Sequence, residues 1–371
     1  MQVPFYSLQS VQAKINTDLL HRLSSVIDRK DFILGKEVSD FENEFAQYCQ
    51  TQYCIGVANG LDALKICLRS LAIGKGDEVI VPANTYIATV LAVLEVGAIP
   101  VLVEPDKHTY NISAENIAPA INAKTKAIIP VHLFGQPCNM DAIGKLAKQH
   151  TLYIIEDNAQ AQGAGFNKQP AGSFGQINAT SFYPSKNLGA MGDAGGITTN
   201  DNELAGKARM LRNVGSSVKY HHQLEGYNSR LDTLQAAVLS CKLPYLNEWN
   251  TDRKRIAARY LNNLKDEKTI VLPGLIEGAE HVYHLFVIRH KQRDELQQYL
   301  SGQHIQTLIH YPIPNHLQPA LAHLGYKKGD LPITEELADT SLSLPLFIDI
   351  TDAQIDYVSD KIISFNKQSL N

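Results

Sequence analysis

Short apolar runs alternate with amphipathic stretches through the first half of the chain. Between residues 54 and 200, seven runs of five to eight residues are largely apolar. Such runs are typical of strands buried on both faces, and their alternation with helical patterns is typical of an α/β sheet covered on both sides. The runs are CIGVA (54–58), EVIVPA (78–83), PVLVEP (100–105), AIIPVHLF (127–134), LYIIED (152–157), ATSFYP (179–184) and GGITT (195–199).

Helical spacing of the apolar residues predicts the elements around this sheet. An amphipathic helix is expected over residues 8–30, and a long polar helix over 244–264. Helical patterns between the apolar runs cover 63–71, 89–95 and 140–149. The chain is therefore expected to be an α/β protein with a large domain, 1–245, that includes the N-terminal helix. A smaller α+β domain, 246–371, should follow and contain a strand at VYHLFVIRH (282–290).

Composition and charge narrow the function by exclusion. The 371 residues carry a formal charge of −4, so nothing indicates binding to nucleic acid or to an anionic membrane. The five cysteines are odd in number and lack C-x-x-C spacing, which predicts buried free thiols rather than disulfides. The N-terminus has no signal-peptide pattern, and no apolar run reaches the length of a membrane span. A cytoplasmic protein is expected.

Several common site motifs are missing from the sequence. It has no G-x-G-x-x-G, no P-loop, no H-E-x-x-H and no G-x-S-x-G. These absences disfavour a Rossmann dinucleotide site, a P-loop nucleotide site, a zinc peptidase and an α/β-hydrolase. The adjacent His221 and His222 have poor spacing for two ligands on one helix face, so no metal site is expected.

Three loop segments at strand ends carry the candidate chemistry. In the first, Gly60 and Leu61 lie at a strand-to-helix turn, where backbone N–H groups and the helix dipole favour a phosphate. An ordinary helix cap around Gly60 and Asp62 is the alternative. In the second, Asp157 ends an apolar strand, where its carboxylate needs a cationic partner unless it caps a helix.

The third segment places Lys186 in a glycine-rich loop just past a strand. A solvent-facing lysine is the usual case, but a partly buried one has a lowered pKa and can form a Schiff base. A phosphate cradle, an acid for a ring nitrogen and an imine-forming lysine together match the arrangement that holds pyridoxal 5′-phosphate (PLP). The 29 residues from Asp157 to Lys186 leave room for one further strand.

The sequence resembles the DegT/DnrJ/EryC1/StrS sugar aminotransferases, a family of fold-type I PLP enzymes. The resemblance covers nearly the whole chain, and six segments occur in the family's order. It begins at FILGKEV (32–38). It continues through PANTYIAT (82–89), VHLFGQPCNMDAI (131–143), EDNAQAQGA (156–164), SFYPSKNLGAMGDAGG (181–196) and YNSRLDTLQAA (227–237), and ends near HYPIPNHLQ (310–318). The fold implied is a mixed central sheet flanked by helices, followed by the smaller domain.

The resemblance assigns roles at matching positions. It implies that Lys186 forms the imine, that Asp157 contacts the pyridine nitrogen and that Gln160 donates to the ring's phenolic oxygen. Further matching positions are Tyr86, which would stack on the ring, Gly60, Leu61 and Ser181, which would hold the phosphate, and Asn228, which would reach it from the neighbouring subunit. A homodimer with shared active sites is thus implied. Leu61 departs from the Thr of many relatives, which matters little if the contact is through the backbone.

The loop from Tyr183 to Asp193 resembles enzymes that aminate C3 of a dTDP-linked 3-keto-6-deoxyhexose. The implied reaction transfers the amino group of L-glutamate and makes an amino sugar for a surface polysaccharide or glycosylated metabolite. Candidate sugar-side residues are Tyr183, Tyr220, His310 and Tyr311, each of which could equally be loop packing. The alternatives are amination at C4 of a dTDP- or UDP-linked 4-keto sugar, a PLP-dependent dehydratase, disfavoured because relatives of that kind have His in place of Lys186, and a non-catalytic sugar-nucleotide-binding protein.

Overall fold

A central sheet of seven strands organises the large domain of the computed structural model, which describes residues 1–369. A short parallel bridge from Asp157, just after β5, to Ala179 of β8 joins a four-stranded part to a three-stranded part. In spatial order the strands are β3 (Ile99–Val103), β2 (Glu78–Pro82), β4 (Thr125–Ile128), β5 (Tyr153–Ile154), β8 (Asn178–Ser181), β9 (Gly195–Thr199) and β1 (Tyr53–Val57).

The strand directions make this a mixed sheet. β3, β2, β4 and β5 pair in parallel, and the bridge at Asp157 sets β8 parallel to them. β9 runs antiparallel to both β8 and β1, so it is the one reversed strand of the seven. The mixed, helix-flanked sheet implied by the resemblance is confirmed.

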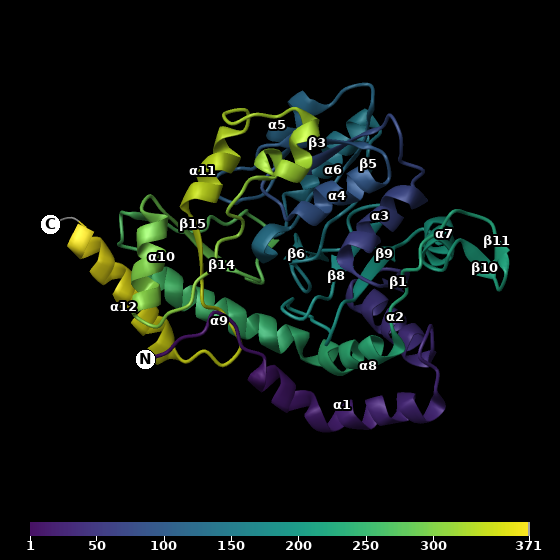
Figure 1. The fold of residues 1–371 in the computed structure, drawn as a ribbon, viewed down its shortest axis with the longest axis horizontal. Coiled ribbons are helices and arrows are strands. Elements are labelled where there is room, and N and C mark those ends of the chain that lie inside the picture. The colour runs from purple at the N-terminus through teal and green to yellow at the C-terminus, as the bar shows by residue number, and fades with distance from the viewer. Residues whose placement is uncertain (370–371) are drawn as a thin grey trace.

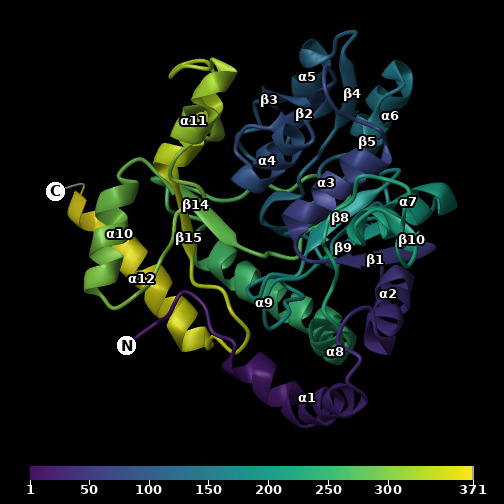
Figure 2. The ribbon, with the colours of Figure 1, turned by 45° about the vertical axis from the view of Figure 1, so that its right-hand side comes forward.

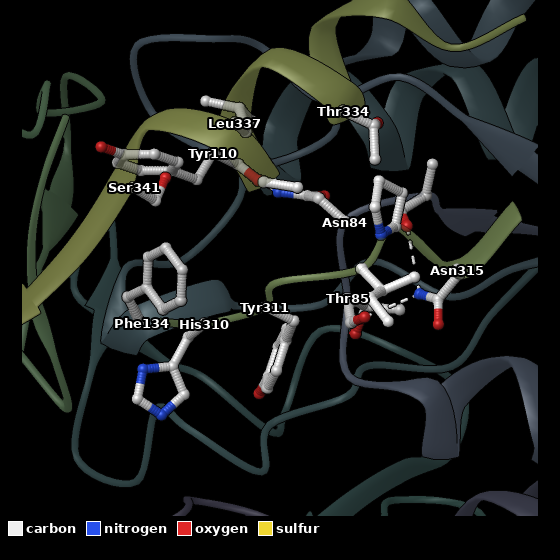
Figure 3. A pocket seen from close by; sticks show the side chains of 14 residues that line it. Asn84, Thr85, Tyr110, Phe134, His310, Tyr311, Asn315, Thr334, Leu337 and Ser341 are labelled. Atoms are coloured by element: carbon white, nitrogen blue, oxygen red, sulfur yellow. Dashed lines mark hydrogen bonds between the residues drawn. The ribbon is translucent and has the colours of Figure 1, made fainter. Parts of the chain in front are cut away.

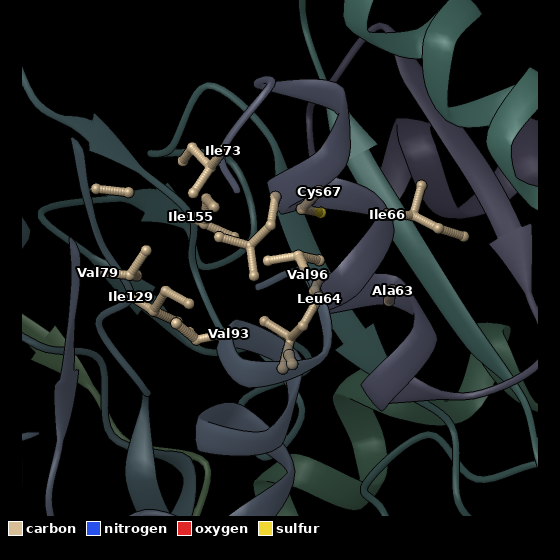
Figure 4. Close-up of a cluster of buried hydrophobic side chains, with 14 of the residues drawn as sticks. Ala63, Leu64, Ile66, Cys67, Ile73, Val79, Val93, Val96, Ile129 and Ile155 are labelled. Atoms are coloured by element: carbon tan, nitrogen blue, oxygen red, sulfur yellow. The ribbon is translucent and has the colours of Figure 1, made fainter. Parts of the chain in front are cut away.

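Helices cover both faces because both faces of the strands are apolar. In β2, Val79 and Val81 pack beneath α3 (Gly60–Ser70), α4 (Ile87–Glu95) and α7 (Asn202–Arg212), as Figure 4 shows for Val79. Ile80, between them, packs on the opposite face with residues of α5 (Ala114–Ile117) and α6 (Met140–His150). Farther along that side, α2 (Lys36–Tyr48) and α8 (Thr233–Lys242) pack against the β1 end of the sheet.

A second apolar core lies around a smaller antiparallel sheet (Figures 1 and 2). Its strands are β12 (Ile270–Val271), β14 (Phe286–His290) and β15 (Ser341–Leu344). α9 (Leu246–Leu264), α10 (Arg293–Gly302) and α12 (Asp352–Ser369) supply most of the rest of this core, and α11 (Pro332–Thr340) packs near the large domain. Alternate residues of β14 point into this core and, on the other side of the strand, toward the large domain. The boundary between residues 245 and 246 stays a prediction.

The remaining elements are short apart from the N-terminal helix α1 (Gln9–Arg29), which packs along α8. They are β6 (Gly165–Phe166), β7 (Gln169–Pro170) and β13 (Ala279–Glu280), which form one small sheet, and the hairpin β10 (Ser216–Val218) and β11 (His221–His222). No helix within residues 1–369 combines the length and the apolar character needed to cross a bilayer.

Two predicted strands are shorter than the apolar runs suggested. The run 127–134 leaves regular pairing after Ile128, because Pro130 has no N–H and the chain turns at Leu133. The run 282–290 is a strand only from Phe286, since the N–H of Val282 donates instead to the carbonyl of Gly135. The helix expected over 8–30 is confirmed, and the long polar helix begins at Leu246 after a 3₁₀ turn.

A buried ion pair ties α2, α7 and β1 together. Arg212 Nη1 contacts Glu42 Oε1 and also donates to the carbonyl of Gly56 at 2.7 Å. Glu42 Oε1 in turn accepts from the N–H of Gly56 at 2.8 Å.

We expect Arg212→Ala to lower the free energy of unfolding by roughly 3–5 kcal/mol, because it leaves Glu42 charged and buried.

Urea denaturation followed by circular dichroism measures this effect. The matched control is Arg22→Ala, which removes an exposed pair with Asp18 and should cost about 0.5 kcal/mol or less. Equal midpoints for the two variants would contradict the assignment.

Candidate active site

Four parallel strands bring the predicted site residues to one edge of the sheet. Gly60 follows β1, Tyr86 follows β2, Asp157 follows β5, and Ser181 ends β8. Ligands of α/β sheets bind beyond the carboxyl ends of the strands, because the loops there converge. The three loop segments singled out in the sequence therefore meet at this edge.

The N-terminus of α3 lies against Ser181. Asn59 caps the helix, because its side chain accepts from the N–H of Asp62 at 2.8 Å. An ordinary helix cap therefore does form at this turn, and the phosphate role of Gly60 and Leu61 stays a prediction. A Cβ on Gly60 would lie 2.6 Å from the Cβ of Ser181, so only glycine allows this approach. Gly60, Leu61 and the Ser181 hydroxyl thus form a cradle that fits a phosphate.

Asp157 is buried behind this cradle. Its Oδ2 accepts from Thr89 Oγ1 at 2.9 Å, and its Oδ1 accepts from the N–H of Ala159 at 3.1 Å. Burial raises the pKa of the carboxyl, while Thr89, Ala159 and Lys186 oppose the rise. Within residues 1–369 no ion pair forms at Asp157 and no helix follows it, so the helix-cap alternative fails. A cationic ring nitrogen would supply the missing partner.

Lys186 lies in the loop between β8 and β9 and is half-buried. Burial lowers the pKa of its amine to about 8, and the charge of Asp157 acts in the opposite direction. A lysine with such a pKa has an appreciable neutral fraction near neutrality, and the neutral amine is the nucleophile that attacks a carbonyl.

Gln160, Tyr311 and Tyr86 form one contact group. Gln160 Oε1 accepts from the N–H of Phe134 at 2.7 Å, and its Nε2 donates to Tyr311 Oη at 3.2 Å. The rings of Tyr86 and Tyr311 lie 5.5 Å apart between centroids. Tyr86 is 55% exposed, which leaves its ring accessible to a ligand. Tyr311, predicted on the sugar side, therefore lies close to the predicted ring-binding residues.

His310 and Tyr183 complete the part of the site near Lys186. Figure 3 shows His310 and Tyr311 side by side in a pocket that also includes Phe134. His310 Nδ1 contacts Ser343 Oγ at 2.8 Å, and burial together with the charge of Lys186 lowers the pKa of His310 to about 4. Its imidazole is therefore neutral at pH 7. Tyr183 is exposed, and its N–H donates to Ser181 Oγ at 3.3 Å.

Two predicted residues are not brought to this group within the chain. Tyr220 is 81% exposed in the turn of the hairpin β10–β11, which projects from the large domain on the side away from α12 (Figure 1). Asn228 is also exposed, and its Oδ1 accepts from Arg230 Nη2 at 2.6 Å. Among the described residues, neither contacts Lys186, Asp157 or Tyr311. Their predicted roles require a second subunit and stay predictions.

Several residues that surround Asp157 in the site were not predicted from the sequence. Thr89 touches Asp157 and also contacts Thr85 Oγ1 at 3.0 Å. Because the hydroxyl of Thr89 donates to Asp157, the bond between the threonines is donated by Thr85. The segment PANTYIAT already places both threonines one helical turn apart, which was the available signal.

A second unpredicted contributor is the pair His132 and Glu156, which lies immediately behind Asp157. His132 Nδ1 accepts from the N–H of Cys138, so His132 Nε2 donates to Glu156 Oε2, at 2.8 Å. Both side chains are completely buried. The carboxylate also accepts three backbone N–H groups, from Gly172, Phe174 and Gly175. No three-residue His, Cys, Asp or Glu group suited to a metal occurs in the part of the chain that the structure describes.

The site and the fold define a PLP-dependent aminotransferase of fold type I. The cradle fits the phosphate, Asp157 fits the ring nitrogen, and the amine of Lys186 fits the imine. The chain belongs to the DegT/DnrJ/EryC1/StrS aminotransferase family, which it matches over residues 13–363. The cofactor is pyridoxal 5′-phosphate.

Individual relatives agree with the family. The chain is 48% identical to a dTDP-3-amino-3,6-dideoxy-α-D-galactopyranose transaminase of Aneurinibacillus thermoaerophilus, over 97% of this chain and 98% of that one. It is 45% identical to a pleiotropic regulatory protein of Geobacillus stearothermophilus, over 98% of this chain and 99% of that one. The crystal structure of Streptomyces venezuelae DesV in complex with a ketimine intermediate superposes with a TM-score of 0.97, at 44% identity, covering 99% of each chain.

The lowered pKa of Lys186 predicts a pH dependence for cofactor capture. The neutral fraction of the amine rises through pH 8 instead of near pH 10.5, so we expect the rate at which apoenzyme captures PLP to increase up to about pH 8 and then level off. Stopped-flow absorbance measures this rate. A rate that keeps rising to pH 10 would show that the amine has an ordinary pKa.

Proposed function

We propose that the enzyme transfers the amino group of L-glutamate to C3 of a dTDP-linked 3-keto-6-deoxyhexose. The product would be an amino sugar for a surface polysaccharide or glycosylated metabolite. The main support is the loop Tyr183–Asp193, which carries the C3-type sequence and holds Lys186 at the edge of the sheet. The relative from A. thermoaerophilus, named for a 3-amino sugar, supports the same carbon.

Each residue of the site has a defined task in this proposal. The bound cofactor supplies an electron sink and carries the amino group between the two substrates. Asp157 keeps a proton on the ring nitrogen, and the hydroxyl of Thr89 helps to hold Asp157 ionised. Gly60, Leu61 and Ser181 orient the phosphate. Lys186 Nζ removes the proton from Cα of glutamate and later returns a proton to C3 of the sugar.

The sugar side is assigned to Tyr183, His310, Tyr311 and, from the neighbouring subunit, Tyr220. His310 is neutral and lies near Lys186, so it can donate or accept a hydrogen bond from a sugar hydroxyl without adding charge. Tyr183 is exposed beside the cradle and can reach a substrate there.

A homodimer is part of the proposal because the site lacks Asn228 and Tyr220 within one chain. Large apolar side chains are exposed on one segment of the chain, at Leu20 and Ile27 of α1 and at Phe32 and Ile33 just after it. Exposed large apolar side chains gathered on one segment are typical of an interface, here one with a second copy. The cytoplasm is the proposed compartment, because the buried cysteines remain thiols in a reducing environment.

A regulatory, non-catalytic role is the second candidate, and the name of the G. stearothermophilus relative favours it. A binding protein has no need for a half-buried lysine whose pKa is lowered to about 8 and which lies within the electrostatic influence of Asp157. The complete set of Lys186, Asp157 and Gln160 therefore favours the enzyme.

One assay tests both the reaction and the carbon. The purified protein is given glutamate with a dTDP-linked 3-keto or 4-keto sugar, and NMR identifies the product. We expect the 3-amino sugar, and loss of the visible cofactor band when glutamate is added alone. Lys186→Ala should lose turnover by at least about 10³-fold, because it removes the proton-transferring group. Amination at C4 would overturn the proposed carbon, and unbleached protein would favour the binding role.

Hybrid dimers test the shared site. Asn228→Ala should weaken cofactor binding by roughly tenfold, since it removes a hydrogen bond to a charged phosphate. At a PLP concentration too low to load Asn228→Ala, mixing it with Lys186→Ala through unfolding and refolding should raise the activity, because each hybrid dimer has one site with both Lys186 and Asn228. An unimproved mixture would mean that Asn228 serves its own chain.

A further inference from the structure

The N-terminal segment crosses between the two sides of the active site. Val3 is completely buried in the core of the smaller domain, where its N–H donates to the carbonyl of His304 and its carbonyl accepts from the N–H of Gln306, both at 3.0 Å. From there the chain runs toward α1, which packs along α8 of the large domain (Figures 1 and 2). Residues 4–8 therefore span the distance between the two cores.

Phe5 supports the substrate side of the site. Its ring stacks on that of His310, with centroids 6.0 Å apart and planes at 27°. Its N–H donates to Gln306 Oε1 at 3.1 Å, which fixes the backbone at this point. With Ser343 bound to Nδ1, His310 is held through its ring face as well as through a nitrogen.

Tyr6 supports the lysine side of the site. Its hydroxyl donates to the carbonyl of Pro184 at 2.9 Å, two residues before Lys186. Burial raises the pKa of Tyr6 to about 12, so the phenol keeps its proton and remains a donor throughout the working pH range. Tyr6 and Lys186 also line the same small cavity.

The loop that Tyr6 contacts is tightly closed. A Cβ on Gly189 would lie 2.3 Å from the carbonyl oxygen of Pro184, so the two ends of the loop touch. Lys242 Nζ donates to the carbonyl of Gly189 at 2.6 Å, while Tyr6 binds Pro184. Two donors from outside the loop therefore hold the ends of the turn that presents Lys186.

We propose that Phe5 and Tyr6 are positioning residues that set the placement of His310 relative to Lys186. One short segment, anchored at Val3 in one core, fixes a side chain on the sugar side with one residue and the lysine loop with the next. The inference rests on the proposed roles of Lys186 and His310. It assigns to the two residues separate effects, one on each half of the reaction.

Tyr6→Phe tests the lysine side with glutamate and cofactor alone. The change keeps the ring and removes the hydrogen bond to Pro184. We expect the half-reaction at saturating glutamate to slow by about threefold to tenfold, and the pH at which the visible band of the lysine-bound cofactor titrates to shift. Tyr357→Phe is the matched control, because its hydroxyl donates to the carbonyl of Gln303 away from the site. If both variants behave alike, the assignment of Tyr6 is wrong.

Phe5→Leu tests the substrate side. We expect KM for the keto sugar to rise by about threefold to tenfold, with the glutamate half-reaction and the thermal midpoint close to those of the wild type. Phe5→Tyr, which keeps the stacking ring, should restore KM. A loss shared equally by both half-reactions, or no change in KM, would overturn the assignment of Phe5.

The two tests separate this inference from the proposed function. If the keto sugar is not the substrate, the wild type itself fails to aminate it, while the Tyr6 comparison still gives its answer through glutamate. If the sugar is aminated and both variants match their controls, the positioning role alone is lost.

Discussion

The buried carboxylate of Asp157 is the constraint around which the large domain is built. It lies where the four-stranded and three-stranded parts of the sheet meet, and its backbone bridges to Val131 on one side and Ala179 on the other. Burial opposes the charge of the carboxylate, so the surrounding structure must supply hydrogen bonds and a cation. The same residue therefore joins the two parts of the sheet and provides a buried carboxylate that a protonated ring nitrogen would stabilise.

The surroundings of Asp157 are arranged to keep it ionised and in place. Thr85 donates to Thr89, and Thr89 donates to Asp157, so a chain of hydroxyls ends on the carboxylate. Behind it, the preceding residue Glu156 is held by His132 and three backbone N–H groups, which fixes the direction of the strand end. Such fully satisfied networks are rigid, which preserves the spacing between Asp157 and Lys186.

The sheet and the family could be predicted from the sequence, because each depends on local pattern, whereas the roles of the cofactor residues stay predictions. Apolar runs identified the strands, and Gly60, Asp157 and Lys186 stood where strand ends must converge. Pattern could not show that Tyr311 reaches Gln160, since 151 residues separate them and only the packing of the two domains brings them together. It also extended the run 282–290 too far, because hydrophobicity does not reveal that Val282 binds Gly135 instead of a strand.

The proposed sugar side of the site depends on contacts that link the two apolar cores. The loop carrying His310 and Tyr311 is attached to the large domain by Asn315, whose Nδ2 donates to the carbonyls of Ala83 and Thr85 at 3.1 and 2.7 Å (Figure 3). Thr85 also begins the hydroxyl chain to Asp157. A shift of this loop would thus disturb His310 and Tyr311 together with the hydroxyl chain that ends on Asp157. This shared attachment fixes the loop of Tyr311 relative to Asp157, although the two residues belong to distant parts of the chain.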